Sequence, residues 1–408
     1  MKCRHCKKLV SNLFLDLGFA PLSNSYLTKE NLKLPEMYLP LRIKVCDKCW
    51  LVQTEDYIDK KNIFKNDYAY FSSTSKTWLA HAKYFVKKIT KELQLSSQSH
   101  VVEIASNDGY LLKNFIDMKI PCLGIEPTKG TAHEAENLKI PVIKKFFSEK
   151  LAKQLADNNK KADLIIGNNV FAHVPNINDF TRGLKVLLKP KGTITLEFPH
   201  LMKLIDNLQF DTIYHEHFSY LSLLTVNRIF KSFGLKIYNV EEIVTHGGSI
   251  RIYGCHENET RRINVSVNKI LNREYNKGLN KLDTYKNFQN KIDLVKNKLL
   301  SFLINQKNKG KKVVAYGAAA KGNTLLNFSK ISHKEIDFVC DASPLKINTL
   351  LPGSHIPVYD ISALNKYKPD IIIILPWNIS KEIVKILNNI NNWGAEYVSF
   401  IPSTINHK

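Results

Sequence analysis

Short apolar runs alternate with turns and helical patterns along the middle of the chain. Residues 101–105 form such a run, rich in β-branched side chains, and the turn residues 106–109 follow it. Residues 110–118 carry apolar positions at helical spacing, and a second apolar run over 123–125 ends on Glu126. A strand, a turn, a helix and a second strand in this order predict a βαβ unit of a parallel sheet.

The same alternation continues and predicts one α/β domain over residues 66–255. Apolar runs at 163–167 and 193–198 predict two more buried strands, and the runs at 236–242 and 249–253 predict a terminal hairpin. Strands alternating with helices and then a hairpin are typical of the Rossmann-like class I methyltransferase sheet rather than of a dehydrogenase.

Hydroxyl residues precede the first helical pattern of this domain. The aromatic stretch 67–71 leads into Ser72, and a helix is predicted over 77–93 with a Ser or Thr as its N-cap. In the alternative interpretation, Tyr68 or Tyr70 lies over a bound cofactor or substrate.

Residues 256–309 have a different pattern, with apolar residues at steps of three and four from Leu279 to Phe302. This spacing predicts one long amphipathic helix with a basic outer face. A connecting helix that packs on the core is favoured over a nucleic-acid-binding arm.

Residues 310–408 begin again with an apolar run, followed by a loop of small residues at 317–324. Later apolar runs complete the pattern of a second Rossmann-like α/β domain. Its loop lacks the middle glycine of the dinucleotide fingerprint, which argues against hydride transfer. A helix start with Lys321 beside it fits an anion site and, equally, close packing of helix on sheet.

Residues 1–65 carry two cysteine pairs with the spacing Cys-x-x-Cys. The four members are Cys3, Cys6, Cys46 and Cys49. Two such pairs predict a small domain around a structural zinc ion held by four thiolates, with no open position for chemistry. Unrelated redox pairs or free core cysteines are the alternatives, and His5 is a less favoured ligand.

The turn after the first central strand and the acid after the second predict a nucleoside site. Gly109 lets the backbone approach the ligand, and Glu126 can accept hydrogen bonds from both ribose hydroxyls. A single glycine, rather than the several of a pyrophosphate cradle, favours S-adenosylmethionine over NAD. The Asn-rich end of the fourth strand would face the same cofactor. The predicted cofactor-binding residues are Ala105, Ser106, Asn107, Asp108, Gly109, Glu126, Pro127, Asn168, Asn169 and His173.

The run Tyr-His-Glu-His-Phe-Ser-Tyr at 214–220 is the most unusual short motif. An imidazole beside a phenol suits removal of a proton next to a carbonyl, because the phenol can hydrogen-bond the enolate. On a helix Tyr214 and His217 would share a face, whereas on a strand His215 and His217 would. A metal site is disfavoured, because the run lacks the zinc-protease spacing. A satisfied polar network is equally compatible with these residues.

Composition and charge narrow the function classes only in part. The net charge of +22 arises from 59 basic and 37 acidic residues and fits nucleic acid or an anionic substrate. The lysines are spread along the chain, however, and no arginine-aromatic block tracks a nucleic-acid backbone. Neither a signal peptide nor a membrane-spanning run is evident, so a cytoplasmic protein without nucleic-acid or membrane partners is predicted.

Seven motifs in order resemble one known family, and together they extend over nearly the whole chain. They are the two Cys-x-x-Cys pairs, Tyr-Phe-Ser-Ser, Glu-Ile-Ala-Ser-Asn-Asp-Gly, the run at 214–220, His-Gly-Gly-Ser and Tyr-Gly-Ala-Ala-Ala-Lys-Gly-Asn. The chain resembles the sugar C-methyltransferase family, whose members methylate C3 of nucleotide-linked 4-keto-6-deoxy sugars. The resemblance implies an N-terminal zinc-binding domain, a central S-adenosylmethionine domain and a C-terminal degenerate copy of it.

The resemblance also implies roles for individual residues. It places catalytic groups at Tyr214, Glu216 and His217, and an early active-site tyrosine at Tyr68 or Tyr70, of which Tyr70 is predicted to be catalytic. The predicted substrate-binding residues are Tyr68, His200, His246, Lys321 and Asn323.

The expected partner is a nucleotide-diphosphate sugar, and a monomer or homodimer is expected. Two alternatives stay open: an RNA-modifying S-adenosylmethionine-dependent methyltransferase, and a non-enzymatic scaffold with two Rossmann-like modules.

Overall fold

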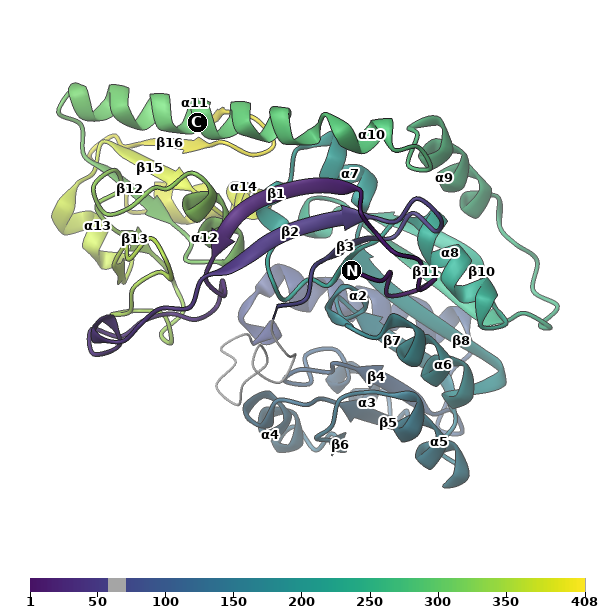
Figure 1. Cartoon of the computed structure of the whole chain (residues 1–408). Helices are drawn as coiled ribbons and strands as arrows, with labels where there is room; N and C mark the ends of the chain where they lie inside the picture. Colours follow the sequence, from purple (N-terminus) through teal and green to yellow (C-terminus); the bar gives the residue numbers. More distant parts are fainter. Residues whose placement is uncertain (58–70, 408) are drawn as a thin grey trace.

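The computed structural model describes residues 1–57 and 71–407, and the strands in these ranges form three sheets (Figure 1). One sheet is N-terminal, one is central and one is C-terminal. In the picture the strands β1 and β2 run between the other two sheets, and the helix α11 extends along one side of the molecule.

The N-terminal sheet is antiparallel and is completed by a strand from the middle of the chain. Its order is β1 (Leu13–Ala20), β2 (Leu39–Val45), β3 (Val52–Thr54) and β9 (Ser219–Tyr220). β9 belongs to the unusual run at 214–220 and pairs with β3 through Val52 opposite Tyr220. The N-terminal sheet therefore holds the end of the run that carries the predicted catalytic residues.

The central sheet has seven strands in the order β10-β11-β8-β7-β4-β5-β6. If the seven strands of this sheet are numbered by their order along the chain, the spatial order is 6-7-5-4-1-2-3. The seventh strand, β11, is antiparallel to both of its neighbours. The predicted class I methyltransferase fold is confirmed. The strand bounds are β4 (Val101–Ile104), β5 (Cys122–Ile125), β6 (Val142–Ile143), β7 (Ala162–Asn168), β8 (Leu188–Pro199), β10 (Leu235–Ile243) and β11 (Ser249–His256).

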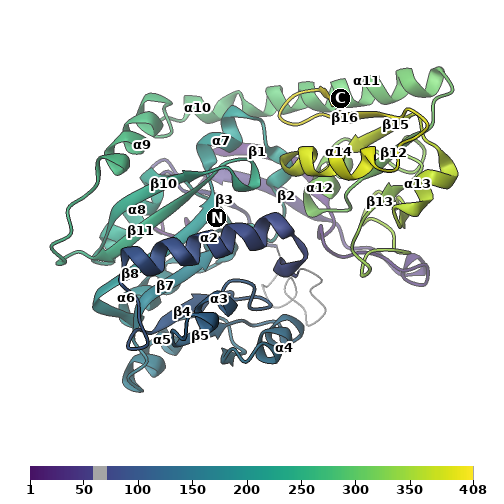
Figure 2. The same cartoon turned by 180° about the vertical axis from the view of Figure 1, so that it is seen from behind.

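Helices cover both faces of the central sheet, because alternate strand residues point to opposite sides. Val101 packs with α2 (Lys76–Glu92) on one face, where α2 crosses the sheet in Figure 2. Val102 packs on the other face, in a cluster with residues of α5, α6 and α8. The remaining bounds are α3 (Lys113–Asp117), α4 (Lys129–Asn137), α5 (Glu149–Asp157), α6 (Ile177–Leu187), α7 (Leu201–Asp206) and α8 (Leu223–Ser232).

Of two local predictions for the central domain, the N-cap of α2 is confirmed and the length of the helix at 110–118 is wrong. The predicted N-cap of α2 is confirmed, because the Ser75 Oγ accepts a hydrogen bond from the Trp78 backbone N–H at 3.2 Å. The helix predicted over 110–118 is shorter than expected. It begins at Lys113, after a turn at 110–112 that continues from the Gly109 loop.

The C-terminal sheet has the order β14-β13-β12-β15-β16-β17, with five parallel strands and an antiparallel edge strand. Its parallel strands follow the third-second-first-fourth-fifth order that the central sheet also has. The strand bounds are β12 (Val313–Tyr316), β13 (Val339–Cys340), β14 (Val358–Tyr359), β15 (Ile371–Ile374), β16 (Glu396–Ser399) and β17 (Ile405–His407). The helices are α12 (Ala320–Phe328), α13 (Ser362–Tyr367) and α14 (Ser380–Asn388).

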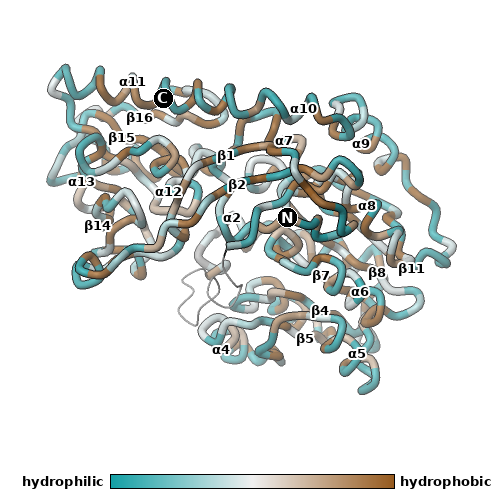
Figure 3. The backbone as a smooth tube through the Cα atoms, viewed as in Figure 1, coloured by the Kyte–Doolittle hydropathy of each residue, from teal (hydrophilic) through white to brown (hydrophobic). Residues whose placement is uncertain are grey.

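The single long connecting helix predicted from Leu279 to Phe302 is wrong. The structure has α9 (Val265–Asn276), α10 (Asp283–Lys286) and α11 (Phe288–Asn308) instead. Gly278 adopts a φ of +79° and ends the α9 turn, because this left-handed conformation cannot continue a helix. Only α11 is long, and its tube in Figure 3 alternates between teal and brown, as expected for an amphipathic helix.

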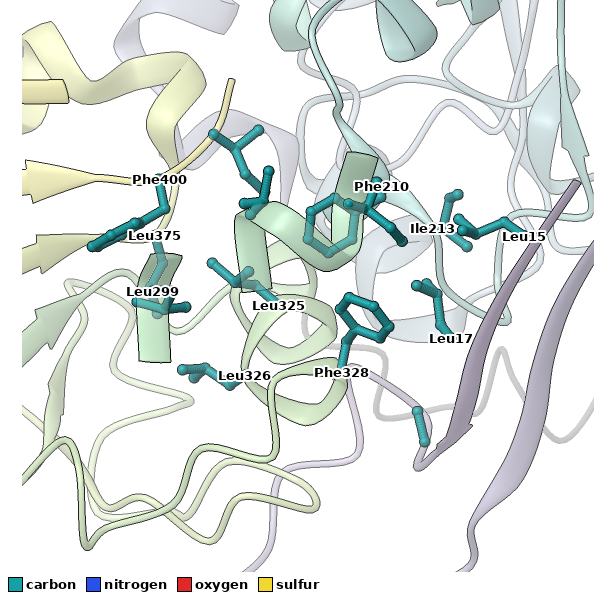
Figure 4. Close-up of a cluster of buried hydrophobic side chains, with 14 of the residues drawn as sticks. Leu15, Leu17, Phe210, Ile213, Leu299, Leu325, Leu326, Phe328, Leu375 and Phe400 are labelled. Carbon is teal, nitrogen blue, oxygen red and sulfur yellow. The ribbon is translucent and has the colours of Figure 1, made fainter. Parts of the chain in front are cut away.

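One apolar core joins the N-terminal sheet to the C-terminal sheet. It brings Leu15 and Leu17 of β1 together with Phe210, Ile213 and residues of α12, as Figure 4 shows. The same cluster includes buried residues of α11 and β15. Among the helices of the described ranges, none is both long and apolar enough to cross a membrane.

Candidate active site

Four cysteines from two segments converge beside the N-terminal sheet, as predicted. The Cys3 and Cys49 sulfur atoms lie 3.5 Å apart, as do those of Cys6 and Cys46. All four Sγ atoms lie within 4.8 Å of one another, which fits four thiolates around one tetrahedral zinc ion. The Gln53 side chain donates to the Cys3 sulfur at 3.4 Å and thus orients one ligand.

The cysteine cluster is anchored to helices of the central domain. Thr225 of α8 donates to the Trp50 carbonyl at 3.0 Å, and Arg228 donates to the Lys48 carbonyl at 2.7 Å. The His5 Nδ1 lies 2.9 Å from the Asn178 amide oxygen of α6 and stays outside the set of four ligands. With four thiolates, the site has no coordination position left for a substrate and is structural.

Three residues of the loop after β4 have positive φ. Ala105, Asn107 and Gly109 have φ values of 57°, 51° and 77°. The Asn107 N–H donates to the Glu126 Oε2 at 3.0 Å, so the acid after β5 also fixes the loop. The Glu126 Oε1 accepts from the Thr128 N–H at 2.9 Å. Burial raises the pKa of Glu126 despite these hydrogen bonds.

Several buried polar atoms around this loop have no hydrogen-bond partner among the described residues. They include the Ser106 hydroxyl, one oxygen of Asp108 and both amide atoms of Asn168 at the end of β7. Buried polar groups are normally paired, so a set of unpaired ones marks the place of a polar ligand. The residues therefore fit the ribose and methionine parts of S-adenosylmethionine.

Glu103 belongs to the same region, and the sequence analysis missed it. Both of its carboxylate oxygens lack a partner within the described part of the chain, and the side chain is fully buried in β4. Burial and the neighbouring Asp108 and Glu126 raise the pKa of Glu103 well above its usual value. The available signal was an acid within an otherwise apolar strand.

The rings of His173, His217 and Tyr214 lie close together. The ring of His217 lies 4.1 Å from that of Tyr214 and 4.5 Å from that of His173, measured between ring centroids. The His173 Nδ1 lies 3.0 Å from the Glu216 carbonyl oxygen and donates to it. Burial lowers the pKa of His173 to about 4, and that of His246 also to about 4.

His217 and His215, the two candidate bases, have different hydrogen-bond partners. The run at 214–217 is a turn, so neither the helical nor the strand arrangement considered from the sequence applies. The His217 Nδ1 donates to the Thr212 carbonyl at 2.8 Å, which leaves the Nε2 lone pair as the acceptor. The His215 Nε2 instead lies 3.2 Å from the Pro40 carbonyl of the N-terminal sheet.

His217 is neutral at physiological pH. Burial lowers its pKa well below the usual value, and the nearby His173, Lys321 and His246 lower it further. A neutral imidazole with one nitrogen already donating is the form that can accept a proton. Glu216 lies beside it in the chain, with its Oε1 accepting from the Asn24 side chain at 2.6 Å.

A polar network at the end of β8 joins two predicted site residues, Asn169 and His246, to residues that the sequence analysis missed. Glu197 at the end of β8 accepts from Arg251 at 2.6 Å and lies 3.0 Å from the His81 Nε2. Burial alone would raise the pKa of Glu197, but His81 and Arg251 bring it down to about 2. The Glu197 backbone carbonyl accepts a hydrogen bond from the Asn169 backbone N–H at 2.8 Å. The Asn169 side-chain nitrogen Nδ2 lies 2.7 Å from the His246 Nε2. The sequence analysis named Asn169 and His246, but it missed His81, Glu197 and Arg251, because these three lie on different elements.

Two residues of the C-terminal domain lie near Asp211: Lys321 at the start of α12 and Trp377 after β15. The Trp377 indole donates to the Asp211 Oδ2 at 2.6 Å, and the Lys321 ammonium lies 5.0 Å from the Trp377 ring centroid. Burial raises the pKa of Asp211 to about 6, although Lys321 and Trp377 oppose the shift. Gly247 makes room for Trp377, because a Cβ there would lie 2.3 Å from the indole.

The other predicted substrate residues have different surroundings. The His200 Nε2 lies 2.6 Å from Glu274, which also accepts the first N–H groups of α8, so these contacts are structural and give its predicted substrate role no support. Asn323 donates to the Ser23 carbonyl at 2.6 Å, while its own Oδ1 has no partner within the described ranges. Pro127 is half-buried directly after Glu126. Tyr68 and Tyr70 lie outside the described residues.

Comparisons with known proteins cover all three parts of the chain. The family model for a C-methyltransferase C-terminal domain matches residues 244–402, that for a zinc-binding domain matches 3–64, and that for a methyltransferase domain matches 78–240. The chain is 30% identical over 388 residues to C-methyltransferase NovU of Streptomyces niveus, covering 95% of this chain and 92% of that protein.

Solved structures align with only part of this chain. An S-adenosylmethionine-dependent methyltransferase from Clostridium acetobutylicum aligns with a TM-score of 0.36 and 14% identity over 44% of this chain and 92% of its own. Magnesium protoporphyrin IX methyltransferase from Synechocystis, solved with bound SAH, aligns with a TM-score of 0.35 and 13% identity over 44% of this chain and 82% of its own.

Proposed function

This chain belongs to the S-adenosylmethionine-dependent C-methyltransferase family, and we propose that it methylates C3 of a nucleotide-linked 4-keto-deoxy sugar. The proposed reaction proceeds through an enolate, with His217 as the general base. The observation that carries this proposal is the donation from the His217 Nδ1 to the Thr212 carbonyl at 2.8 Å. It leaves the Nε2 of a buried, neutral imidazole to accept a proton beside the Tyr214 ring.

The proposed mechanism assigns each residue one task. The 4-keto group acidifies the C3 proton, which His217 takes at Nε2. Tyr214 or a neighbouring donor hydrogen-bonds the developing enolate oxygen, and Glu216 binds sugar hydroxyls or orients a partner. S-adenosylmethionine, when bound, supplies the electrophilic methyl group that C3 attacks.

The charge around the imidazoles suits a substrate that carries a diphosphate. The positive charge of Lys321 acts on both His217 and His246, as the lowered pKa of each imidazole indicates. Burial also lowers the pKa of Lys321, so an anionic ligand close to it would restore a favourable charge pair. We therefore place the diphosphate side of the substrate towards Lys321, with Asn323 on the same helix.

The decisive experiment follows the C3 proton rather than the methyl group. The purified protein is incubated in heavy water with 4-keto-6-deoxy sugars linked to thymidine, uridine, cytidine or guanosine diphosphate, and exchange at C3 is read by NMR. We expect His217→Ala to lower this exchange by about 10²–10⁴-fold, the usual share of a general base. Cofactor and nucleotide-sugar binding should persist, since neither requires the imidazole.

His215→Ala is the matched control, because it removes a neighbouring imidazole that contacts the Pro40 carbonyl instead. Wild-type exchange in His217→Ala, with loss of exchange in His215→Ala, would reverse the assignment of the base. The same binding assay addresses the RNA alternative, since RNA affinity falls steeply with salt and that of a small anionic sugar does not. The match to a C-methyltransferase answers the scaffold alternative.

A further inference from the structure

Two side chains of the C-terminal domain donate hydrogen bonds to the segment 211–213, which carries the Thr212 carbonyl. On one side of Thr212, the Trp377 indole donates to Asp211 at 2.6 Å. On the other side, the Thr324 hydroxyl of α12 donates to the Ile213 carbonyl at 2.8 Å. The carbonyl between these two anchors is the one that accepts the His217 Nδ1–H.

Apolar packing fixes the same segment against α12. Phe210 and Ile213 are fully buried, and the rings of Phe210 and Phe328 meet at 5.4 Å with an interplanar angle of 67°. Figure 4 shows Phe210 and Phe328 facing each other between β1 and α12. Close packing of this kind resists small rotations of the backbone. The direction of the Thr212 carbonyl is therefore set by residues more than 100 positions further along the chain.

We propose that the C-terminal domain positions the general base: Trp377 and Thr324 orient the Thr212 carbonyl, which holds His217 in the tautomer with its lone pair on Nε2. Trp377 and Thr324 are positioning residues, because they act on His217 only through residues 211–213. This inference rests on the proposed role of His217. It gives the C-terminal sheet a task in catalysis that needs no ligand bound in its own loop.

The orientation matters because an imidazole has two neutral tautomers. When the acceptor for Nδ1–H moves, the proton can shift to Nε2, and the nitrogen that faces the substrate can no longer take up a proton. Proton removal should then slow while substrate binding is retained. The expected kinetic signature is a lower kcat with a KM close to that of the wild type.

The test compares variants that differ only in the two anchors. Thr324→Val removes the hydroxyl at nearly constant shape, Thr324→Ser keeps it, and Trp377→Phe removes the indole N–H. Trp393→Phe is the matched control, since the Trp393 indole donates to the Pro369 carbonyl at 2.8 Å within the same domain. We expect C3 proton exchange to fall about tenfold in Thr324→Val and Trp377→Phe, and to stay near the wild-type rate in Thr324→Ser and Trp393→Phe.

A second readout needs no turnover. In protein with ¹⁵N-labelled histidine, the His217 signals, identified by their loss in His217→Ala, should show Nδ1 protonated in the wild type. In Thr324→Val they should shift towards a mixture of tautomers. Exchange and tautomer unchanged in Thr324→Val would overturn the positioning role, and so would a loss of exchange equally large in Trp393→Phe.

The two readouts separate this inference from the proposed function. If the wild type shows no C3 exchange on any sugar, the proposed function fails while the tautomer shift still decides the positioning role. If exchange depends on His217 but not on Thr324 or Trp377, the positioning role fails alone. Should Trp377→Phe fold poorly, Thr324→Val carries the test together with Thr324→Ser.

Discussion

The central and C-terminal sheets begin with the same strand order, yet their first loops are used in opposite ways. In each, a strand leads into a loop with a glycine at positive φ, Gly109 at 77° and Gly317 at 95°. In each, an acid follows the second strand, Glu126 after β5 and Asp341 after β13. The difference lies in what satisfies the polar groups around the loop.

The central loop leaves polar groups without protein partners. The Ser106 hydroxyl and one Asp108 oxygen are buried and unpaired within the described residues, and so is the Asn168 amide at the neighbouring strand end. Such atoms are costly to bury alone, which supports the proposal that a ligand binds here. The cofactor of this enzyme family supplies hydrogen-bonding groups of that kind.

The C-terminal loop has protein partners at Ala318 and Asp341, and within the described residues its buried unpaired atom is the Asn323 Oδ1. The Ala318 carbonyl accepts from the Tyr26 hydroxyl at 2.6 Å and from the Lys346 ammonium at 2.7 Å. Asp341 lies 3.6 Å from the same Lys346 and accepts the Ser343 N–H at 2.8 Å. The comparison shows that the same βαβ pattern leaves several buried polar groups unpaired in the central domain, whereas around Ala318 and Asp341 of the C-terminal domain other parts of the chain supply the partners.

Alanine at each loop glycine is the strongest test of this difference. Gly317→Ala should destabilise the fold by at least about 2 kcal/mol, because positive φ is strained and the new Cβ would lie 2.2 Å from the Pro376 ring. Gly109→Ala should cost less stability, since its nearest obstacle at 2.5 Å is the flexible end of Ile140. Denaturant unfolding and calorimetric titration with S-adenosylmethionine measure the two effects.

Only the Gly109 variant should lose cofactor affinity among correctly folded protein. Weaker cofactor binding by folded Gly317→Ala would show that the C-terminal loop takes part in cofactor binding. Equal affinity in both variants and the wild type would show that the cofactor lies elsewhere than the Gly109 loop.

The contact between Asp211 of the central domain and Trp377 of the C-terminal domain can be tested through its dependence on pH. Burial in the folded state raises the pKa of this carboxyl from its usual value of about 3.9 to about 6, so the folded protein binds more protons between these values. Its contribution to stability is present below about pH 4 and is lost as the pH rises through about 6. Asp211→Asn cannot ionise and keeps an acceptor for Trp377, so it should be more stable at pH 7 by up to about 3 kcal/mol.

Urea unfolding of both proteins from pH 4 to pH 8 measures this gain. The advantage of the variant should grow from pH 4 to pH 6 and then level off. A variant less stable than the wild type at every pH would mean that the ionised carboxylate is needed to hold Trp377. Because the Asn oxygen still accepts the Trp377 N–H, the positioning role predicts proton removal near the wild-type rate in this variant.

Substitution of the two acids after the second strands should give the smallest changes. Glu126→Ala should weaken S-adenosylmethionine binding by roughly 1.5–3 kcal/mol, the range for hydrogen bonds to a charged group. Asp341→Ala should leave this affinity unchanged, because Asp341 pairs with Lys346. Calorimetric titration of both variants gives the comparison directly, and equal losses would contradict the assignment of the cofactor to the central loop alone.

Local patterns in the sequence predicted the central and C-terminal α/β sheets but not the N-terminal sheet that β9 completes. Continuous apolar runs predicted strands of the central sheet and the start of the C-terminal one, because strands of a parallel sheet are buried on both faces. The paired spacing of cysteines gave the zinc ligands, since two knuckles can hold one ion only in a limited way. The same kind of pattern misled over 279–302, because the apolar spacing runs through the turn at 277–282 and through Asn287, which separates α10 from α11.

The tertiary structure alone decided which histidine can act and what holds it. His215 and His217 are two residues apart and chemically alike, yet one contacts Pro40 and the other Thr212. No local rule links Trp377 to Asp211, 166 positions away, or Thr324 to Ile213, 111 positions away. Periodicity and spacing express the geometry of neighbouring residues, whereas the orientation of a carbonyl or the pKa of an imidazole depends on groups brought together by packing.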